Sequence, residues 1–157
     1  MEANHASPED GLVELYRAEH QMMVRLATLM VGSVAVAEEV VQDAFAVVGE
    51  RWDQLSRPGG YLRQVVVNQC RQVLRRGVHE TNAANLRQPA LITRLPEHHI
   101  ELYDALTVLT DRQRAVVVLR YFADIPDTEI AELLGARPST VRSLARRALT
   151  ALAKELE

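Results

Sequence analysis

The chain has 157 residues, of which 48% are hydrophobic and 25% are charged, and its formal net charge is −3. This hydrophobic content is enough for a packed core and too high for a disordered chain, and the length allows one ordinary domain or two small ones. The slightly acidic balance means that global electrostatics would not draw the protein to nucleic acid or to a membrane. Any such binding must come from local charge.

Acidic and basic residues are sorted into blocks along the chain. Residues 35–53 hold five carboxylates and one arginine, whereas residues 55–76 hold five arginines and no carboxylate. Residues 135–154 hold four arginines, one lysine and again no carboxylate. The sequence therefore predicts one acidic and two basic surfaces.

The single cysteine, Cys70, excludes an intramolecular disulfide and a multi-cysteine zinc site. It sits among valines on a helical pattern, so we expect a small buried hydrophobe rather than a reactive thiol. The amino terminus is acidic and has no basic flank followed by an apolar run, which predicts no secretory signal. The longest apolar run, residues 26–37, is too short to cross a bilayer. We expect a cytoplasmic protein with no membrane segment of its own.

In chain order, the first half of the sequence predicts three helices. A leucine and methionine stripe over residues 12–30 gives a helix that ends at Gly32. Apolar residues from Val40 to Leu55 give a second helix, and "SRPGG" at 56–60 reads as a turn. The third helix covers residues 61–74 and carries arginines on its other face.

The second half begins with a segment that lacks helical periodicity. Residues 77–96 are polar and contain two prolines, which predicts a flexible linker. A short helix is expected around 100–107, followed by "TDRQ", Thr110 to Gln113, a capping box that opens a helix through Phe122. The expected fold class is all-α, with two small helical domains at residues 10–76 and 97–157 joined by the linker.

The stretch "EIAELLGARPSTVRSLARRAL", residues 129–149, has the spacing of a helix-turn-helix unit. Gly135 supplies a residue that tolerates positive φ in the turn, and Ala131 provides a small side chain where the helices cross. Val141 and Leu144 fall on the inward face of the second helix. Pro138 suits its first turn, because the missing N–H costs nothing there.

The opposite face of this second helix carries hydroxyl groups and arginines. Such groups at a helix start can reach base edges or phosphates in a major groove. An amphipathic hairpin with a solvated basic face is the alternative, but the spacing favours DNA binding. The predicted DNA-contacting residues are Arg137, Ser139, Thr140, Arg142, Ser143, Arg146 and Arg147, with Thr150 on the same face.

Two parts of the chain together resemble the extracytoplasmic-function (ECF) sigma factors, the small dissociable subunits of bacterial RNA polymerase in the sigma-70 superfamily. The segment "LTDRQRAVVVLRYFADIPDTEIAELLGARPSTVRSLARRAL" is similar to sigma domain 4. The segments "AEEVVQDAFAVVGERWDQL" and "YLRQVVVNQCRQVLRR" are similar to sigma domain 2. The resemblance implies a factor that binds core polymerase and recognises −35 duplex and melted −10 DNA.

The resemblance also assigns the charged blocks. It implies that the acidic second helix docks on the β′ clamp helices of the polymerase, which are a basic coiled coil, and that domain 4 meets the β flap. Charge complementarity there would speed encounter and set orientation. The residues expected to bind the polymerase are Glu38, Glu39, Gln42, Asp43, Phe45 and Glu50.

The third helix matches the region that captures the non-template −10 strand. Its arginines suit phosphates, the amide of Asn68 can donate and accept, and aromatic rings beside the 56–60 turn can stack on an unpaired base. Trp52 also continues an apolar stripe, so a core role is equally open. The residues expected to bind the −10 strand are Trp52, Tyr61, Arg63, Asn68, Arg71, Arg75 and Arg76.

The sequence shows no nucleophile with a base, no glycine-rich phosphate loop and no set of metal ligands, so we expect no enzyme activity and no cofactor. His98 and His99 are expected to be solvated. An anti-sigma factor partner is implied by the resemblance alone. Two other readings stay open: a stand-alone helix-turn-helix regulator with an N-terminal dimerisation or sensor domain, and a polymerase-binding protein without promoter function.

Overall fold

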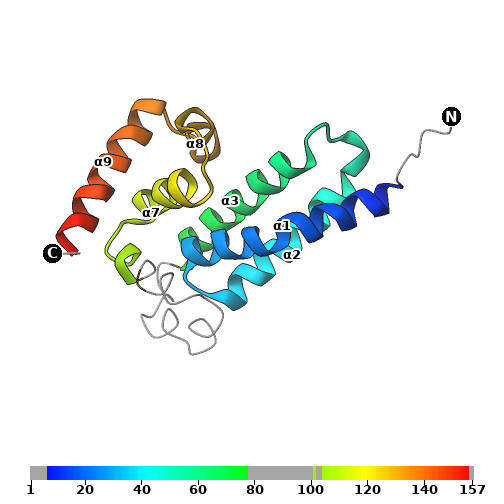
Figure 1. The fold of residues 1–157 in the computed structure, drawn as a ribbon, viewed down its shortest axis with the longest axis horizontal. Coiled ribbons are helices and arrows are strands. Elements are labelled where there is room, and N and C mark those ends of the chain that lie inside the picture. Colours follow the sequence, from blue (N-terminus) through cyan, green and yellow to red (C-terminus); the bar gives the residue numbers. More distant parts are fainter. Residues whose placement is uncertain (1–6, 78–100, 102–103, 156–157) are drawn as a thin grey trace.

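The computed structural model describes residues 7–77, 101 and 104–155, and every regular element in these ranges is a helix (Figure 1). The elements are α1 (Pro8–Val31), α2 (Val34–Glu50), the 3-10 turn η1 (Trp52–Gln54), α3 (Pro58–Gly77), α7 (Asp111–Val117), the π-helical turn η2 (Val118–Phe122), α8 (Asp127–Leu134) and α9 (Pro138–Glu155). The expected linker lies outside the described residues from 78 onward. Of the short helix expected at 100–107, residues 101 and 104–106 are helical.

Several helix ends lie where the sequence predicts them. The α1 helix ends at Gly32, which has a left-handed backbone with φ 82°. The Thr110 side chain accepts from the Gln113 N–H while the Gln113 side chain accepts from the Thr110 N–H, so the predicted capping box is confirmed. Ser33 caps α2 by accepting from the Val36 N–H.

Two predicted boundaries were wrong. The α2 helix ends at Glu50 instead of continuing through Leu55, and Trp52–Gln54 forms a separate 3-10 turn. The α3 helix begins at Pro58 rather than Tyr61. Proline has no N–H to lose in a first turn, so "PGG" forms that turn and the Tyr61 N–H donates to the Arg57 carbonyl at 3.1 Å.

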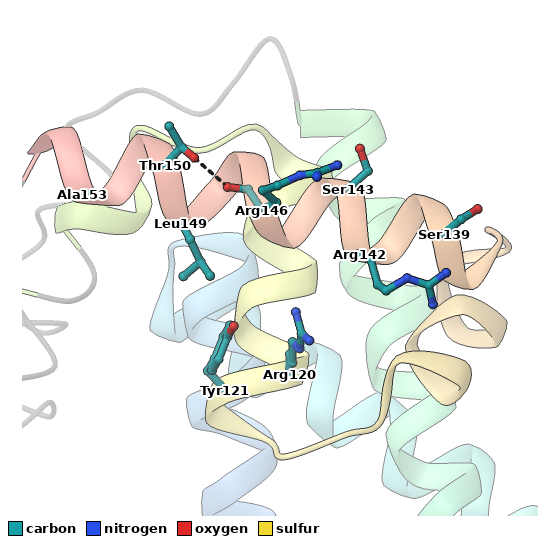
Figure 2. A pocket seen from close by; sticks show the side chains of 9 residues that line it. All are labelled: Arg120, Tyr121, Ser139, Arg142, Ser143, Arg146, Leu149, Thr150 and Ala153. Atoms are coloured by element: carbon teal, nitrogen blue, oxygen red, sulfur yellow. Dashed lines mark hydrogen bonds between the residues drawn. The ribbon is translucent and has the colours of Figure 1, made fainter.

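A third departure lies between α7 and α8. The helix predicted through Phe122 widens after Val117 into the π-helical turn η2, and the Ala123 N–H donates to the Val118 carbonyl at 3.0 Å. Asp124 then takes a left-handed backbone with φ 55°. The widened turn brings Arg120 and Tyr121 to a common side, beside α9 (Figure 2).

The helices form two modules whose cores meet. The helices α1, α2 and α3 pack on one another and make the N-terminal module, while α7, η2, α8 and α9 make the C-terminal module. Figure 1 shows α7 and α8 lying beside α3, and both α1 and α3 contact the C-terminal module. The buried apolar residues of the two modules form one continuous cluster.

Cys70 lies on α3 inside this core. Its side chain is fully buried, and desolvation raises the pKa of the thiol to about 12. The prediction of a small buried hydrophobe is confirmed.

The joint between α8 and α9 depends on one left-handed residue. Gly135 has φ 61° and ψ 37°, and its N–H donates to the Glu132 carbonyl at 3.2 Å. The next N–H, from Ala136, donates to the Ala131 carbonyl at 2.8 Å. These two bonds form a Schellman motif, which ends α8 and turns the chain into α9.

We predict that Gly135→Ala lowers the free energy of unfolding by about 1 kcal/mol, because a side chain disfavours the left-handed backbone. A Cβ at this position would have no atom within 4 Å, so steric overlap adds nothing. Gly135→Asn should cost less, since asparagine adopts this conformation more readily. Urea unfolding of the three proteins measures the difference, and equal costs for alanine and asparagine would contradict the explanation.

Candidate nucleic-acid interface

The outward face of α9 is basic and exposed. Arg142, Arg146 and Arg147 are exposed, as is Ser139, while Val141 on the opposite side is fully buried. Ala145 and Ala148 complete the buried side, on which α9 packs against α7 and α8. Leu144 and Leu152 are half-buried at its margin.

Polar groups at the start and end of α9 complete this face. Arg137 is exposed, and its carbonyl accepts the first helical bond of α9, from the Val141 N–H at 3.1 Å. Thr140 and Ser143 are half-buried. The Thr150 hydroxyl donates to the Arg146 carbonyl at 2.9 Å. The Thr150 hydroxyl proton is therefore used in a hydrogen bond within α9.

An open groove of about 790 Å³ runs along this face (Figure 2). It is bounded by α9 and by Arg120 and Tyr121 of the turn η2. The Tyr121 side chain is 56% exposed, and the Arg120 guanidinium lies 5.5 Å from the centre of its ring. Sequence reasoning missed both residues, because their positions depend on the π-helical turn. The groove is lined by Arg120, Tyr121, Ser139, Arg142, Ser143, Arg146, Leu149, Thr150 and Ala153.

An ion pair ties this groove to the start of α8. The Arg120 Nε lies 3.3 Å from Oδ1 of Asp127, the first residue of that helix. The ion pair holds the Arg120 side chain at the edge of the groove. The Asp127 carboxylate also interacts favourably with the positive end of the α8 dipole.

The second basic surface lies on α3, where the predicted residues divide into two groups. Asn68, Arg75 and Arg76 are exposed, whereas Arg63 and Arg71 are half-buried against α8. Arg63 Nη1 lies 3.4 Å from Glu129 Oε1. The structure does not gather all the predicted residues on one open face.

Arg71, like Arg63, contacts α8. Its Nη1 donates to the Leu133 carbonyl at 3.4 Å. The pKa of Arg71 is lowered by burial first, and then by the neighbouring charges of Arg75 and Arg112. These three arginines, from both modules, line a groove of about 370 Å³ together with Leu74, Asp111, Ala115 and Leu134.

The two aromatic residues predicted beside the −10 strand are both half-buried. A Cβ on Gly11 would lie 2.6 Å from Cζ2 of Trp52, so the indole edge is packed directly on α1. Tyr61 packs on the core, with the Arg51 guanidinium 6.0 Å from its ring centre. Trp52 therefore has a packing role, as the apolar stripe indicates.

The acidic surface lies on α2. Glu39, Gln42, Asp43 and Glu50 are exposed and Glu38 is half-buried, so these groups share one side of the helix.

Phe45, predicted with them, is only 6% exposed. Its ring lies beneath Tyr16 of α1, at 4.9 Å between centroids, and Tyr16 stacks on His20 at 4.4 Å. The aromatic group that reaches the surface beside the acidic residues is therefore Tyr16, which the sequence analysis did not include among the polymerase-binding residues.

Within the described residues, no group of three or more His, Cys, Asp or Glu side chains could hold a metal ion. His98 and His99 lie outside them. No helix in the described ranges is long and apolar enough to span a membrane.

Comparison with family models matches both modules. The model described as Sigma-70 region 2 matches residues 15–79, and the model described as Sigma-70, region 4 matches residues 99–152.

Among curated proteins, the RNA polymerase sigma-E factor of Streptomyces avermitilis is 31% identical over 150 residues, covering 92% of this chain and 84% of that protein. The ECF RNA polymerase sigma factor SigM of Mycobacterium tuberculosis is 31% identical over 163 residues, covering 99% of this chain and 82% of SigM.

Solved structures give the same picture of the fold. The Mycobacterium tuberculosis extracytoplasmic function sigma factor SigJ superposes with a TM-score of 0.70 at 27% identity, covering 90% of this chain and 53% of SigJ. The sigma factor RpoE of Bartonella quintana, solved in complex with the anti-sigma factor NepR, gives a TM-score of 0.68 at 20% identity. That match covers 91% of this chain and 96% of RpoE.

The basic helix-turn-helix module and the three-helix module together carry one acidic and two basic surfaces, which suits a protein of the transcription machinery. The chain belongs to the ECF sigma factors of the sigma-70 family. It directs transcription initiation with RNA polymerase, and this family is non-enzymatic. The reading as a stand-alone regulator is therefore excluded.

We predict that Asp127→Asn lowers the free energy of unfolding by about 1 kcal/mol, because it removes the ion pair with Arg120 and a favourable charge at the start of α8. Asp124→Asn is the matched control. It removes the same charge three residues earlier, at an exposed left-handed position that asparagine tolerates. Thermal unfolding compares the two, and an equal loss in both would contradict a specific role for the pair.

Proposed function

We propose that the three charged surfaces divide the work of initiation. The α9 face reads the −35 duplex, the α3 face holds the non-template −10 strand, and the α2 face docks on the polymerase. The observation that carries this proposal is the one-sided face of α9, where Arg142 and Arg146 are exposed opposite a fully buried Val141.

The α9 face suits a major groove. Arg142 and Arg146 lie on successive turns of α9, so both can point into the DNA major groove, as the side chains of a recognition helix do. Arg137 at the start of the helix and Arg147 beside the face suit phosphates, which position the helix without reading sequence. Arg120 and Tyr121 form the wall of the protein groove across from α9, where they could contact the sugar-phosphate backbone of the bound DNA.

The α3 face suits a single strand. Asn68, Arg75 and Arg76 are exposed on it, and they combine an amide that pairs with base edges and cations for phosphates. We assign Arg63 and Arg71 to the same strand once α8 has left them. We propose that the half-buried Tyr61, and any edge of Trp52 that its packing on α1 leaves exposed, form the start of this surface.

The α2 face suits a basic partner. Glu39, Asp43 and Glu50 are exposed on it, and the stacked rings of Tyr16 and His20 supply apolar contact next to this charge. We propose that it binds the β′ clamp helices and that the C-terminal module meets the β flap. The protein then acts in the cytoplasm, where the polymerase works. An anti-sigma factor is a further proposed partner, because the related RpoE was solved in complex with one.

We predict that the double change Arg142→Ala and Arg146→Ala lowers −35-dependent initiation at least about tenfold, since each lost base or phosphate contact weakens recognition. Run-off transcription with purified core polymerase measures this on a promoter that the wild-type holoenzyme uses. The control Arg17→Ala with Lys154→Ala removes two exposed cations outside the groove. Full activity of the groove variant on such a promoter would refute the assignment.

We predict that Glu39→Lys with Asp43→Lys slows association with core polymerase roughly tenfold at low salt, and by less at high salt, because electrostatic steering is screened. The control Glu14→Lys with Glu155→Lys makes the same change in net charge at exposed positions off this surface. Association rates are measured at two ionic strengths. If the control slows as much, net charge rather than this surface governs docking.

A further inference from the structure

The groove wall across from α9 is built from an unusual length of helix. The π-helical turn η2 continues α7, and it buries Val118 and Leu119 while Arg120 and Tyr121 line the groove. Turns of this kind are rare in proteins and are frequently found at functional sites. Figure 2 shows the Arg120 and Tyr121 side chains pointing from η2 toward α9. The turn therefore presents the two side chains to the groove together.

Arg120 is held from two sides. Its Nε lies 3.3 Å from Oδ1 of Asp127, and its guanidinium carbon lies 5.5 Å from the centre of the Tyr121 ring. The side chain is 34% exposed, and its two terminal nitrogens donate no hydrogen bond within the described residues. The N–H groups on these nitrogens are therefore available to a ligand in the groove.

Tyr121 supports this arginine more than it fills the core. Its side chain is 56% exposed, whereas the two residues before Arg120 are buried. One part of the Tyr121 side chain borders a small apolar cavity of about 110 Å³ beside Val118, and another part borders the groove. A ring anchored in this way attracts the guanidinium and restricts its rotamers.

The position across from α9 indicates the ligand of Arg120. In the proposed function, Arg142 and Arg146 of α9 enter the DNA major groove, so a cation on the opposite wall faces the sugar-phosphate backbone beside it. A guanidinium is well suited to a phosphate, because its planar N–H groups can donate to two oxygens at once. Of the described residues that line the groove, none carries a carboxylate that would compete with this anion.

We propose that Arg120 binds a phosphate of the −35 duplex and that Tyr121 is a positioning residue, which acts on DNA only through Arg120. The inference rests on the proposed role of α9, and it divides the work between the two wall residues. Arg120 supplies the charge. The Tyr121 ring and the Asp127 carboxylate hold the guanidinium in place, so that less conformational entropy is lost when the phosphate binds.

The test measures binding of the holoenzyme to a labelled duplex from a promoter that the wild type uses. This duplex carries the −35 element and ends upstream of the −10 element, so that melting does not contribute. Fluorescence anisotropy at several salt concentrations gives the Kd and the salt slope, which reports the number of phosphates contacted.

Arg120→Ala should weaken binding about tenfold and reduce the salt slope by about one, because one charge-assisted phosphate contact is lost. Arg17→Ala, which removes an exposed cation outside the groove, should change neither value. An unchanged salt slope for Arg120→Ala would overturn the phosphate contact.

Variants of Tyr121 separate positioning from direct contact with DNA. Tyr121→Leu should weaken binding about threefold, the scale of an exposed cation–π contact, and Tyr121→Phe should bind like the wild type because it keeps the ring. In the Arg120→Ala background, Tyr121→Leu should have no further effect, since no guanidinium remains to be positioned. The positioning role is overturned by equal losses in both backgrounds, by a loss for Tyr121→Phe, or by wild-type affinity for Tyr121→Leu.

Failure of the proposed function gives a different result. Arg142→Ala with Arg146→Ala would then bind this duplex as tightly as the wild type does. If that variant binds weakly while Arg120→Ala and Tyr121→Leu keep wild-type affinity and salt slope, α9 reads the duplex and only the assignment of Arg120 and Tyr121 is overturned.

Discussion

The left-handed turn at Gly135 is the constraint on which the DNA-reading half of the molecule depends. Its two Schellman bonds end α8 and set the direction of α9, and this direction buries Val141 while leaving Arg142 in solvent. Charge alone could not achieve this, because the three arginines of a helix that could rotate freely would present no defined face. A backbone conformation that costs little only for glycine therefore determines which side chains reach the groove.

On α2 and α9, the charged side of the helix lies opposite a buried apolar side. The acidic side of α2 is backed by Phe45, which lies buried beneath Tyr16, and the basic side of α9 is backed by small alanines that allow close helix packing. In both cases an apolar side fixes the rotation of the helix, and the polar side is then free to serve a partner. The net charge of −3 conceals this arrangement, since surfaces of opposite sign cancel in the sum.

Features set by local sequence could be predicted, and features set by distant contacts could not. The capping box at Thr110, the end of α1 at Gly32 and the burial of Cys70 follow from residue type and spacing. The start of α3 at Pro58 was missed because proline and glycine serve turns and first helical turns equally well. The π-helical turn shifts the register by one residue, so a regular 3.6-residue pattern could not place Tyr121 at the groove. The contact of Arg63 with Glu129 spans 66 residues, and no periodicity reports such a pair.

The contact between α3 and α8 uses arginines of α3 rather than apolar side chains. An apolar face would bury itself against α8 permanently, and the polymerase would then have to expose it to water in order to reach DNA. In the proposed function, an arginine exchanges one polar partner, the Leu133 carbonyl, for another, a phosphate, at little net cost. In that proposal the same guanidinium thus binds α8 in the free protein and DNA in the promoter complex. A lysine would be a poorer substitute, because its ammonium lacks the planar set of donors and is more strongly hydrated. On that proposal, reversible exchange between these partners, rather than maximal stability with either one, is the reason for polar contacts between α3 and α8.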